Sequence, residues 1–168
     1  FTGDAQITGS LIVSGSAEFR GTENKSTNVV LGPVLGATSA NSVIIGNGAG
    51  IAFGGGNNTA IGDSAIIQNN TQFGTAVGKS SSVTGTAGIA YGYFATAAGE
   101  GIAIGRSATA ATYGIAIGKS VTAGSSQLAI GYENTTISAS LSTGHVILSG
   151  STGGLELIGS GSTMFEVI

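Results

Sequence analysis

A glycine that follows each of a series of short apolar runs constrains this sequence most. It ends phrases such as SVIIG, NTAIG and GIAIG, and it recurs at intervals of 14, 16, 16, 14, 13, 13 and 13 residues. A short, nearly constant period indicates a solenoid, in which each repeat forms one coil that stacks on its neighbours. Glycine suits a sharp reversal after each run because it adopts a positive φ cheaply. These turn glycines are Gly32, Gly46, Gly62, Gly78, Gly92, Gly105, Gly118 and Gly131.

Each apolar run is predicted to form a short β-strand. The residues three and one positions before the turn glycine are mostly large and apolar, for example Ile102 and Ile104. Because side chains alternate along a strand, these positions share one face, and we predict that this face points into the core. The residue between them would then point outward, and we expect it to pack against other subunits near a threefold axis. In six coils this residue is alanine, at Ala60, Ala76, Ala90, Ala103, Ala116 and Ala129.

A second short strand is predicted after each turn. The residues three and five positions after the glycine are mostly small and apolar, as at Ala95 and Ala97, and we expect them to face inward. The threonines between such positions are expected to face solvent, at Thr96, Thr109, Thr122 and Thr135. The sequence therefore predicts an all-β, thin, two-sided roll of eight coils, about 38 Å long at the usual strand spacing.

Composition and charge restrict the possible functions. Apolar residues make up 41% of the chain, which argues against disorder despite 31 glycines. The net charge of −3, with five basic residues, argues against a nucleic-acid binder. The absence of cysteine excludes disulfides and thiolate metal sites. Polar residues and glycine interrupt every apolar run, so we expect no membrane insertion. The chain begins at Phe1 without a signal-peptide pattern, and we expect a segment of a longer protein.

The repeat resembles a known family. The stretches NTAIGDSA at 58–65, GIAIGRSA at 101–108 and GIAIGKS at 114–120 resemble the head repeats of YadA-like trimeric autotransporter adhesins. The resemblance covers about residues 28–135. It implies a left-handed parallel β-roll that is homotrimeric, displayed on a surface and used for attachment.

The flanks depart from that family, because no neck motif and no heptads follow residue 135. The N-terminal phrases GDAQIT, GSLIVS and GSAEFR alternate apolar and polar residues, which is typical of β structure. Both flanks resemble repeats of phage tail fibres, in which three chains form a β-prism. We therefore divide the chain into an N-terminal β-prism-like shaft segment (1–27), the β-roll (28–135) and a C-terminal β-prism-like segment (136–168).

Motifs for enzyme chemistry are weak. The GKS phrases at 78–80 and 118–120 have three residues between their glycines, whereas a phosphate loop needs four. His145 is the sole histidine and is expected on the surface at a strand end. Asp63 and Glu100 are candidates for a carboxylate pair only by default. We expect neither an enzyme nor a bound cofactor or metal.

Two sets of residues are candidates for ligand binding. Three of the five basic residues occupy the position directly after the turn glycine, where coils would stack them in a column with two tyrosines. This ladder of Lys79, Tyr93, Arg106, Lys119 and Tyr132 could bind an anionic glycan, or it could be a solvated turn. Five residues before the glycine, Phe73 and Tyr113 could bind a ligand or pack on a neighbouring coil or subunit.

These features together predict an extracellular, trimeric adhesive fibre segment that mediates attachment to a host cell surface, within a phage or virion tail fibre. One alternative is the head of a bacterial trimeric autotransporter adhesin that binds matrix or cell-surface ligands. Another is a structural spacer without binding of its own, and a third is a degradative enzyme of the tailspike type. The expected partners are two further copies of the chain and a glycan or protein receptor on the host surface.

Overall fold

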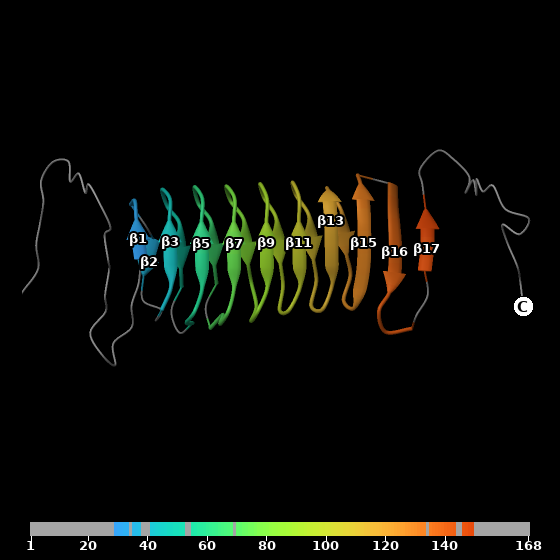
Figure 1. Cartoon of the computed structure of the whole chain (residues 1–168), viewed down its shortest axis with the longest axis horizontal. Helices are drawn as coiled ribbons and strands as arrows, with labels where there is room; N and C mark the ends of the chain where they lie inside the picture. The colour runs from blue at the N-terminus through green and yellow to red at the C-terminus, as the bar shows by residue number, and fades with distance from the viewer. Residues whose placement is uncertain are drawn as a thin grey trace, which may run out of the picture.

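The chain forms a solenoid of β-strands without helices in the part that the structure describes. The computed structural model describes residues 29–33, 35–37, 41–52, 55–68, 70–133, 135–143 and 146–149. Figure 1 shows the coils following one another along the long axis of the molecule, with β16 and β17 beyond the last coil. The predicted all-β parallel solenoid is confirmed.

The chain passes alternately between two parallel sheets, here called sheet A and sheet B. The parallel strands of sheet A are β1 (Val29–Leu31), β3 (Val43–Ile45), β5 (Thr59–Ile61), β7 (Thr75–Val77), β9 (Ile89–Tyr91), β11 (Ile102–Ile104), β13 (Ile115–Lys119) and β15 (Gln127–Tyr132). The strands of sheet B are β2 (Leu35–Ala37), β4 (Gly50–Ile51), β6 (Ile66–Ile67), β8 (Ser82–Val83), β10 (Thr96–Ala97), β12 (Thr109–Ala110) and β14 (Thr122–Ala123). Equivalent residues pair in register, as Ala103 does with Ala90 and Ala116.

The roll ends one coil earlier than predicted. Seven strands of sheet B give about seven turns, not eight coils. After β15 the chain reverses into β16 (Thr135–Ser140), which pairs antiparallel with it, and β17 (Val146–Ser149) pairs antiparallel with β16. The prediction that Thr135 belongs to a second-sheet strand is therefore wrong, because Thr135 begins β16 in sheet A. The predicted prism segment 1–27 lies outside the described residues, as does most of 136–168.

The alanine column lies inside the roll, which corrects the prediction that it faces other subunits. Each of these alanines is at most 3% exposed within the single chain: Ala60, Ala76, Ala90, Ala103, Ala116 and Ala129. The positions three and one before the glycine, such as Ile102 and Ile104, correspondingly point outward. In these six coils the small alanine of sheet A meets the buried residues of sheet B across a narrow core. In an earlier coil the same inward position is filled by Ile44, which is also fully buried.

The predictions for sheet B are largely confirmed. Its inward positions are buried, with Ala95 and Ala97 in one coil and Ile51, Ile67 and Val83 in the earlier coils. Thr109 and Thr122 are exposed on the outer face, and Thr96 is half-buried there. The core is thus a narrow layer of small and medium apolar side chains from both sheets, continuous along the solenoid axis.

The turn glycines have two structural reasons. Seven of them, from Gly32 to Gly118, have φ between +105° and +139°, as predicted. Crowding is the second reason: a Cβ built on Gly78 would lie 2.6 Å from the carbonyl oxygen of Gly92 in the next coil. Gly131 differs, because it lies within β15 and is absent from the residues with positive φ, so the strand continues to Tyr132.

A buried asparagine organises the longest coils. The Asn58 side chain is fully buried, its Oδ1 accepts a hydrogen bond from the Gly74 amide at 2.7 Å, and its Nδ2 donates to the Thr71 carbonyl at 2.8 Å. In the later, shorter coils the equivalent position is a buried glycine, such as Gly88 or Gly101. Asn58 therefore secures the longer 68–74 connection against the core.

Candidate interaction surfaces

The outer face of sheet A is apolar along the whole roll. We call this surface the apolar strip; it consists of Val29, Leu31, Val43, Ile45, Thr59, Ile61, Thr75, Val77, Ile89, Tyr91, Ile102, Ile104, Ile115, Ile117, Leu128 and Ile130. None of these side chains is charged, and all are half-buried or exposed, with Ile104 39% exposed. Eight strands about 4.8 Å apart and about 10 Å long give a footprint on the order of 400 Å². Apolar patches of this size are often functional.

The apolar strip continues past the roll. Ile137 in β16 stands opposite Ile130 in β15, and Ala139 stands opposite Leu128. Directly opposite residues of paired strands point to the same face of a sheet, so Ile137 extends the strip and is 53% exposed. The antiparallel β16 therefore preserves the strip although it ends the solenoid.

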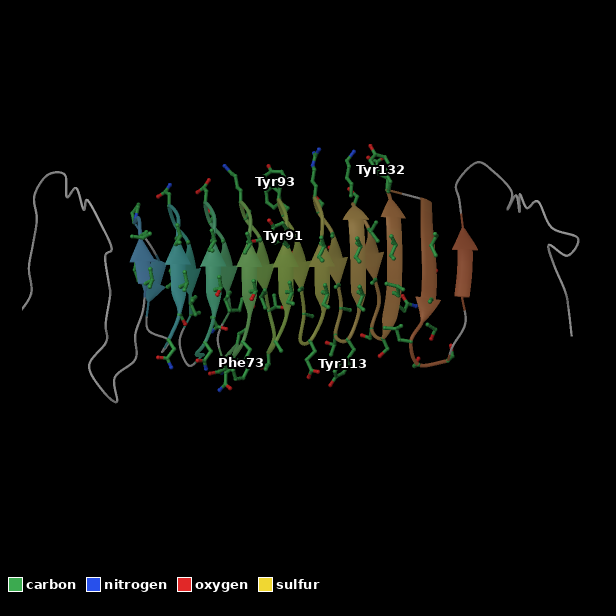
Figure 2. The ribbon with its side chains drawn as sticks, viewed as in Figure 1. Phe73, Tyr91, Tyr93, Tyr113 and Tyr132 are labelled. Carbon is green, nitrogen blue, oxygen red and sulfur yellow. The ribbon has the colours of Figure 1, made fainter. Side chains whose placement is uncertain are left out.

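One corner of the roll carries the predicted ladder. It lies at the end of the sheet A strands, directly after the turn glycines, and we call it the basic corner; it consists of one residue from each of six successive coils, Asp63, Lys79, Tyr93, Arg106, Lys119 and Tyr132. Backbone hydrogen bonds fix it: the Phe94 amide donates to the Lys79 carbonyl at 3.0 Å, and the Ser107 amide donates to the Tyr93 carbonyl at 2.8 Å. Figure 2 shows Tyr93 and Tyr132 along this edge of the roll. The structure therefore stacks all five predicted ladder residues in one column.

Two of the three lysine and arginine side chains on the basic corner are paired with carboxylates. Lys79 Nζ lies 2.9 Å from Asp63 Oδ2. The hydrogen bond and positive charge of Lys79 hold the pKa of Asp63 below its ordinary value, and the same contact raises the pKa of Lys79. The predicted ladder omitted the negative charge of Asp63. This charge makes the Lys79 end of the basic corner nearly neutral.

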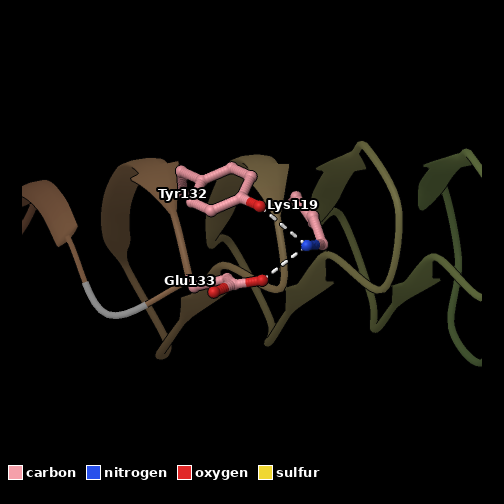
Figure 3. Close-up of polar contacts among 3 residues, drawn as sticks. All are labelled: Lys119, Tyr132 and Glu133. Atoms are coloured by element: carbon pink, nitrogen blue, oxygen red, sulfur yellow. Dashed lines mark hydrogen bonds and ion pairs between the residues drawn. The ribbon is translucent and has the colours of Figure 1, made fainter.

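Lys119 has three contacts at the other end of the basic corner. Its Nζ lies 2.5 Å from Glu133 Oε1, 2.8 Å from the Tyr132 hydroxyl and 4.6 Å from the centroid of the Tyr132 ring. Figure 3 shows the two polar contacts. Its hydrogen bonds to Glu133 and Tyr132 raise the pKa of Lys119, and the bond from Lys119 lowers the pKa of Glu133. Sequence reasoning missed Glu133, which stands two residues after the glycine.

Arg106 is the cation left between these two pairs. Its side chain is exposed and has no hydrogen bond or ion pair with any residue that the structure describes. Its charge contributes weakly to the lowered pKa of Glu133. The positive charge available to a ligand on this corner is therefore concentrated at Arg106.

The coil before Arg106 carries three exposed aromatic residues. Tyr91, Tyr93 and Phe94 are 57%, 43% and 50% exposed. The rings of Tyr93 and Phe94 have centroids 4.5 Å apart and an interplanar angle of 69°. Phe94 has φ +56°, which is unusual for a bulky residue, and serine occupies its position at Ser80 and Ser107. Sequence reasoning missed Phe94, although the run YGYF at 91–94 was the available signal.

The second aromatic set is not brought together. Phe73 and Tyr113 are both exposed, and Figure 2 shows them along the edge opposite Tyr93 and Tyr132. Successive coils place Ala87 and Glu100 between them. Three coil spacings separate the two rings' backbones by about 14 Å, so they do not form one site.

The remaining candidates lose support or lie outside the described residues. The GKS phrases fall in strand ends and turns of the basic corner. Asp63 lies on that corner and Glu100 on the opposite one, so they form no carboxylate pair. His145 is outside the described residues. In the part of the chain that is described, no group of three potential metal ligands gathers. No described helix is long and apolar enough to cross a membrane.

No family model, no curated protein and no solved structure matches this chain. Its class, a parallel β-solenoid, is defined by the strand order and register described above.

Proposed function

We propose that this chain is a segment of a homotrimeric extracellular fibre that attaches a virion to a host cell surface, as phage tail fibres do. The apolar strip carries the proposal. It is half-buried to exposed in the single chain, bears no charge and runs the length of the roll, so its further burial against another surface is favourable.

The partner that fits the apolar strip best is another copy of the same chain. The strip repeats the same two positions at every coil, as the register of Ile102 and Ile104 with Ile115 and Ile117 illustrates. A second roll in parallel orientation presents side chains at the same spacing, so every coil can pack at once. A partner without this period would match a few coils and leave the others poorly packed.

The number of copies and the attachment function rest on resemblance. The repeat resembles trimeric adhesin heads, and three narrow rolls can bring their strips together around one axis. In the proposed trimer the strip of large apolar side chains faces the threefold axis, whereas the alanines lie buried inside each roll. The resemblance of the flanks to tail-fibre repeats favours a virion over a bacterial adhesin.

Light scattering tests self-assembly. The chain is expected to be a trimer at micromolar concentration. Ile104→Glu should dissociate it, because three carboxylates would be buried near the axis. Thr109→Glu is the matched control, because Thr109 is exposed on the outer face of sheet B. A wild-type monomer, or an I104E trimer, would overturn the assembly proposal.

Adsorption tests attachment and separates the alternatives. The labelled trimer is incubated with a panel of bacterial cells and with immobilised mammalian matrix. Saturable binding to particular bacterial cells supports the tail-fibre proposal, whereas binding to matrix alone supports the adhesin alternative. A trimer that binds neither surface supports the spacer, and cleavage of a bacterial capsule polysaccharide supports the tailspike-type enzyme.

A further inference from the structure

The basic corner combines apolar rings and an unpaired cation at its centre. Tyr93 and Phe94 belong to one coil, and Arg106 occupies the position of Tyr93 in the next coil. The 2.8 Å hydrogen bond from the Ser107 amide to the Tyr93 carbonyl fixes these coils side by side. The residues that carry the two rings and the guanidinium therefore lie on adjacent coils, whose backbones are about one strand spacing apart.

The charges around this group select for an anion. Lys79 is paired with Asp63 on one side, and Lys119 is paired with Glu133 on the other. Within the described residues, Arg106 retains its full capacity for hydrogen bonding. A guanidinium binds a carboxylate through two parallel hydrogen bonds, which fixes both the position and the orientation of the anion.

The rings next to Arg106 select for a ligand with an apolar face. Tyr93 and Phe94 contact each other edge to face and remain about half exposed. The C–H-bearing face of a pyranose packs on such rings, whose π faces carry partial negative charge. Phe94 contributes little to the core, because its side chain is 50% exposed. Its φ of +56° belongs to the repeat, since Ser80 and Ser107 have φ of +54° and +55° at the same turn position.

We propose that Tyr93, Phe94 and Arg106 form a binding site for an acidic sugar, with the pyranose on the rings and its carboxylate on Arg106. This inference rests on the proposed attachment function and specifies its ligand. The distance between coils is close to the length of one pyranose along a glycan. A chain running along the basic corner therefore reaches the Tyr132 ring two coils further on. An acidic peptide could pair with Arg106 but has no ring-stacking sugar face.

The test measures binding of the full chain to immobilised polysaccharides at low and moderate salt. The probes are hyaluronan, in which every second sugar carries a carboxylate, neutral dextran and poly-glutamate. The site predicts saturable binding to hyaluronan that weakens with salt, with little binding to dextran. Binding to dextran equal to that of hyaluronan, or binding to poly-glutamate alone, would overturn the proposal.

Three substitutions test the site itself, and two of them use residues found at the same positions of other coils. Arg106→Gln should weaken hyaluronan binding about tenfold, because a charge-assisted pair is lost. Tyr93→Asn and Phe94→Ser should each weaken it several-fold, and both new residues occur at those positions in other coils, at Asn47 and Ser80. Tyr113→Ala is the control, since it removes an equally exposed ring from the opposite corner.

The outcomes separate this site from the proposed function. Light scattering and far-ultraviolet circular dichroism of each variant confirm assembly and fold. If wild-type trimer adsorbs to cells and R106Q adsorbs equally well, the acidic-sugar site is wrong and the attachment function stands. If folded wild-type trimer adsorbs to no cells, the attachment function fails even if hyaluronan binds in isolation.

Discussion

Lys79 Nζ lies 2.9 Å from the carboxylate of Asp63, which occupies the equivalent position of the preceding coil. A parallel roll stacks equivalent residues directly beside one another, so a single charge at this position always meets the residue one repeat away. The basic corner therefore alternates in charge at this end instead of repelling itself. At the other end Lys119 pairs with Glu133, which follows the equivalent residue Tyr132, and Arg106 is left as the unpaired cation among the described residues of this corner.

The first prediction concerns the titration of this pair. The lowered pKa of Asp63 means that the pair stabilises the fold above pH 3.8, the ordinary value, and that this contribution is lost as the pH falls through the lowered pKa. The raised pKa of Lys79 means that the contribution persists below 10.5 and is lost as the pH rises through the raised value. Lys79→Gln should return the pKa of Asp63 toward 3.8, measured by carboxyl NMR titration.

Lys119→Gln is the matched control for that titration. It should leave the pKa of Asp63 unchanged and raise the pKa of Glu133 toward 4.5, its ordinary value. Both pairs are solvent-exposed, so high salt should reduce both shifts. An Asp63 pKa that does not respond to K79Q would show that the contact does not persist in solution.

The second prediction tests the inward direction of the alanine column. Ala103→Leu adds three carbons to a fully buried position between the two sheets. We expect a loss of about 1–3 kcal/mol in the free energy of unfolding, because a close-packed core cannot accept the volume without strain. The measurement is the midpoint of urea unfolding.

Thr109→Val is the control for that substitution, because Thr109 is exposed on β12. Its effect should stay within about 0.5 kcal/mol. If A103L were as stable as wild type while T109V were not, the alanines would face outward and the corrected orientation would fail.

The period of the sequence predicted the coils, the strands and the burial of sheet B, since a stack must place equivalent residues together. It did not predict which face of sheet A is inside. Alternation shows that Ile102 and Ile104 share a face opposite Ala103, but both faces are apolar, so hydrophobicity cannot distinguish them. Size gives a partial signal, because the smaller residue lies inside in the six coils that have alanine at this position, whereas Ile44 is fully buried at the same position of an earlier coil.

The sequence also could not locate the end of the roll. The phrase QLAIG before Gly131 has the same form as the phrases that end in reversing glycines. The difference lies in the conformation of Gly131 and in the hairpin to β16, which depend on residues beyond the repeat. At the basic corner, the ladder followed from spacing alone, whereas the pairing of Lys119 with Glu133 depends on side-chain directions that spacing does not specify.

The third prediction separates two reasons for glycine at these turns, namely the positive φ and the crowding against the backbone of the next coil. Gly78 has φ +126°, and a Cβ there would lie 2.6 Å from the carbonyl oxygen of Gly92. Gly48 has φ +65°, and a Cβ there would meet Ser64 Oγ at an ordinary 3.6 Å. Gly48→Ala should cost about 1 kcal/mol, whereas Gly78→Ala should cost about 3 kcal/mol or more, measured by urea unfolding. Equal costs would show that backbone crowding between coils contributes nothing.

The fourth prediction concerns the buried polar contacts of the 68–74 connection. Asn58→Ala removes the partners of the Gly74 amide and the Thr71 carbonyl, which are both inside the roll. Each buried group left unpaired costs about 1–3 kcal/mol, so we expect a loss of about 3 kcal/mol in the free energy of unfolding. The exposed neighbour Gln72 supplies the control, and Gln72→Ala should be nearly neutral.

Thr71, in the same connection, tests the removal of a buried polar group that has no hydrogen-bonding partner in the described part of the chain, whereas Asn58 is a buried group whose partners are satisfied. Its side chain is 1% exposed, and its hydroxyl has no hydrogen-bonding partner within the described structure. Thr71→Val keeps the shape and removes the desolvated hydroxyl, so stability should stay equal or rise by about 1 kcal/mol in urea unfolding. A T71V loss comparable to that of N58A would mean that the hydroxyl holds a buried water in solution, because only a satisfied group is costly to remove.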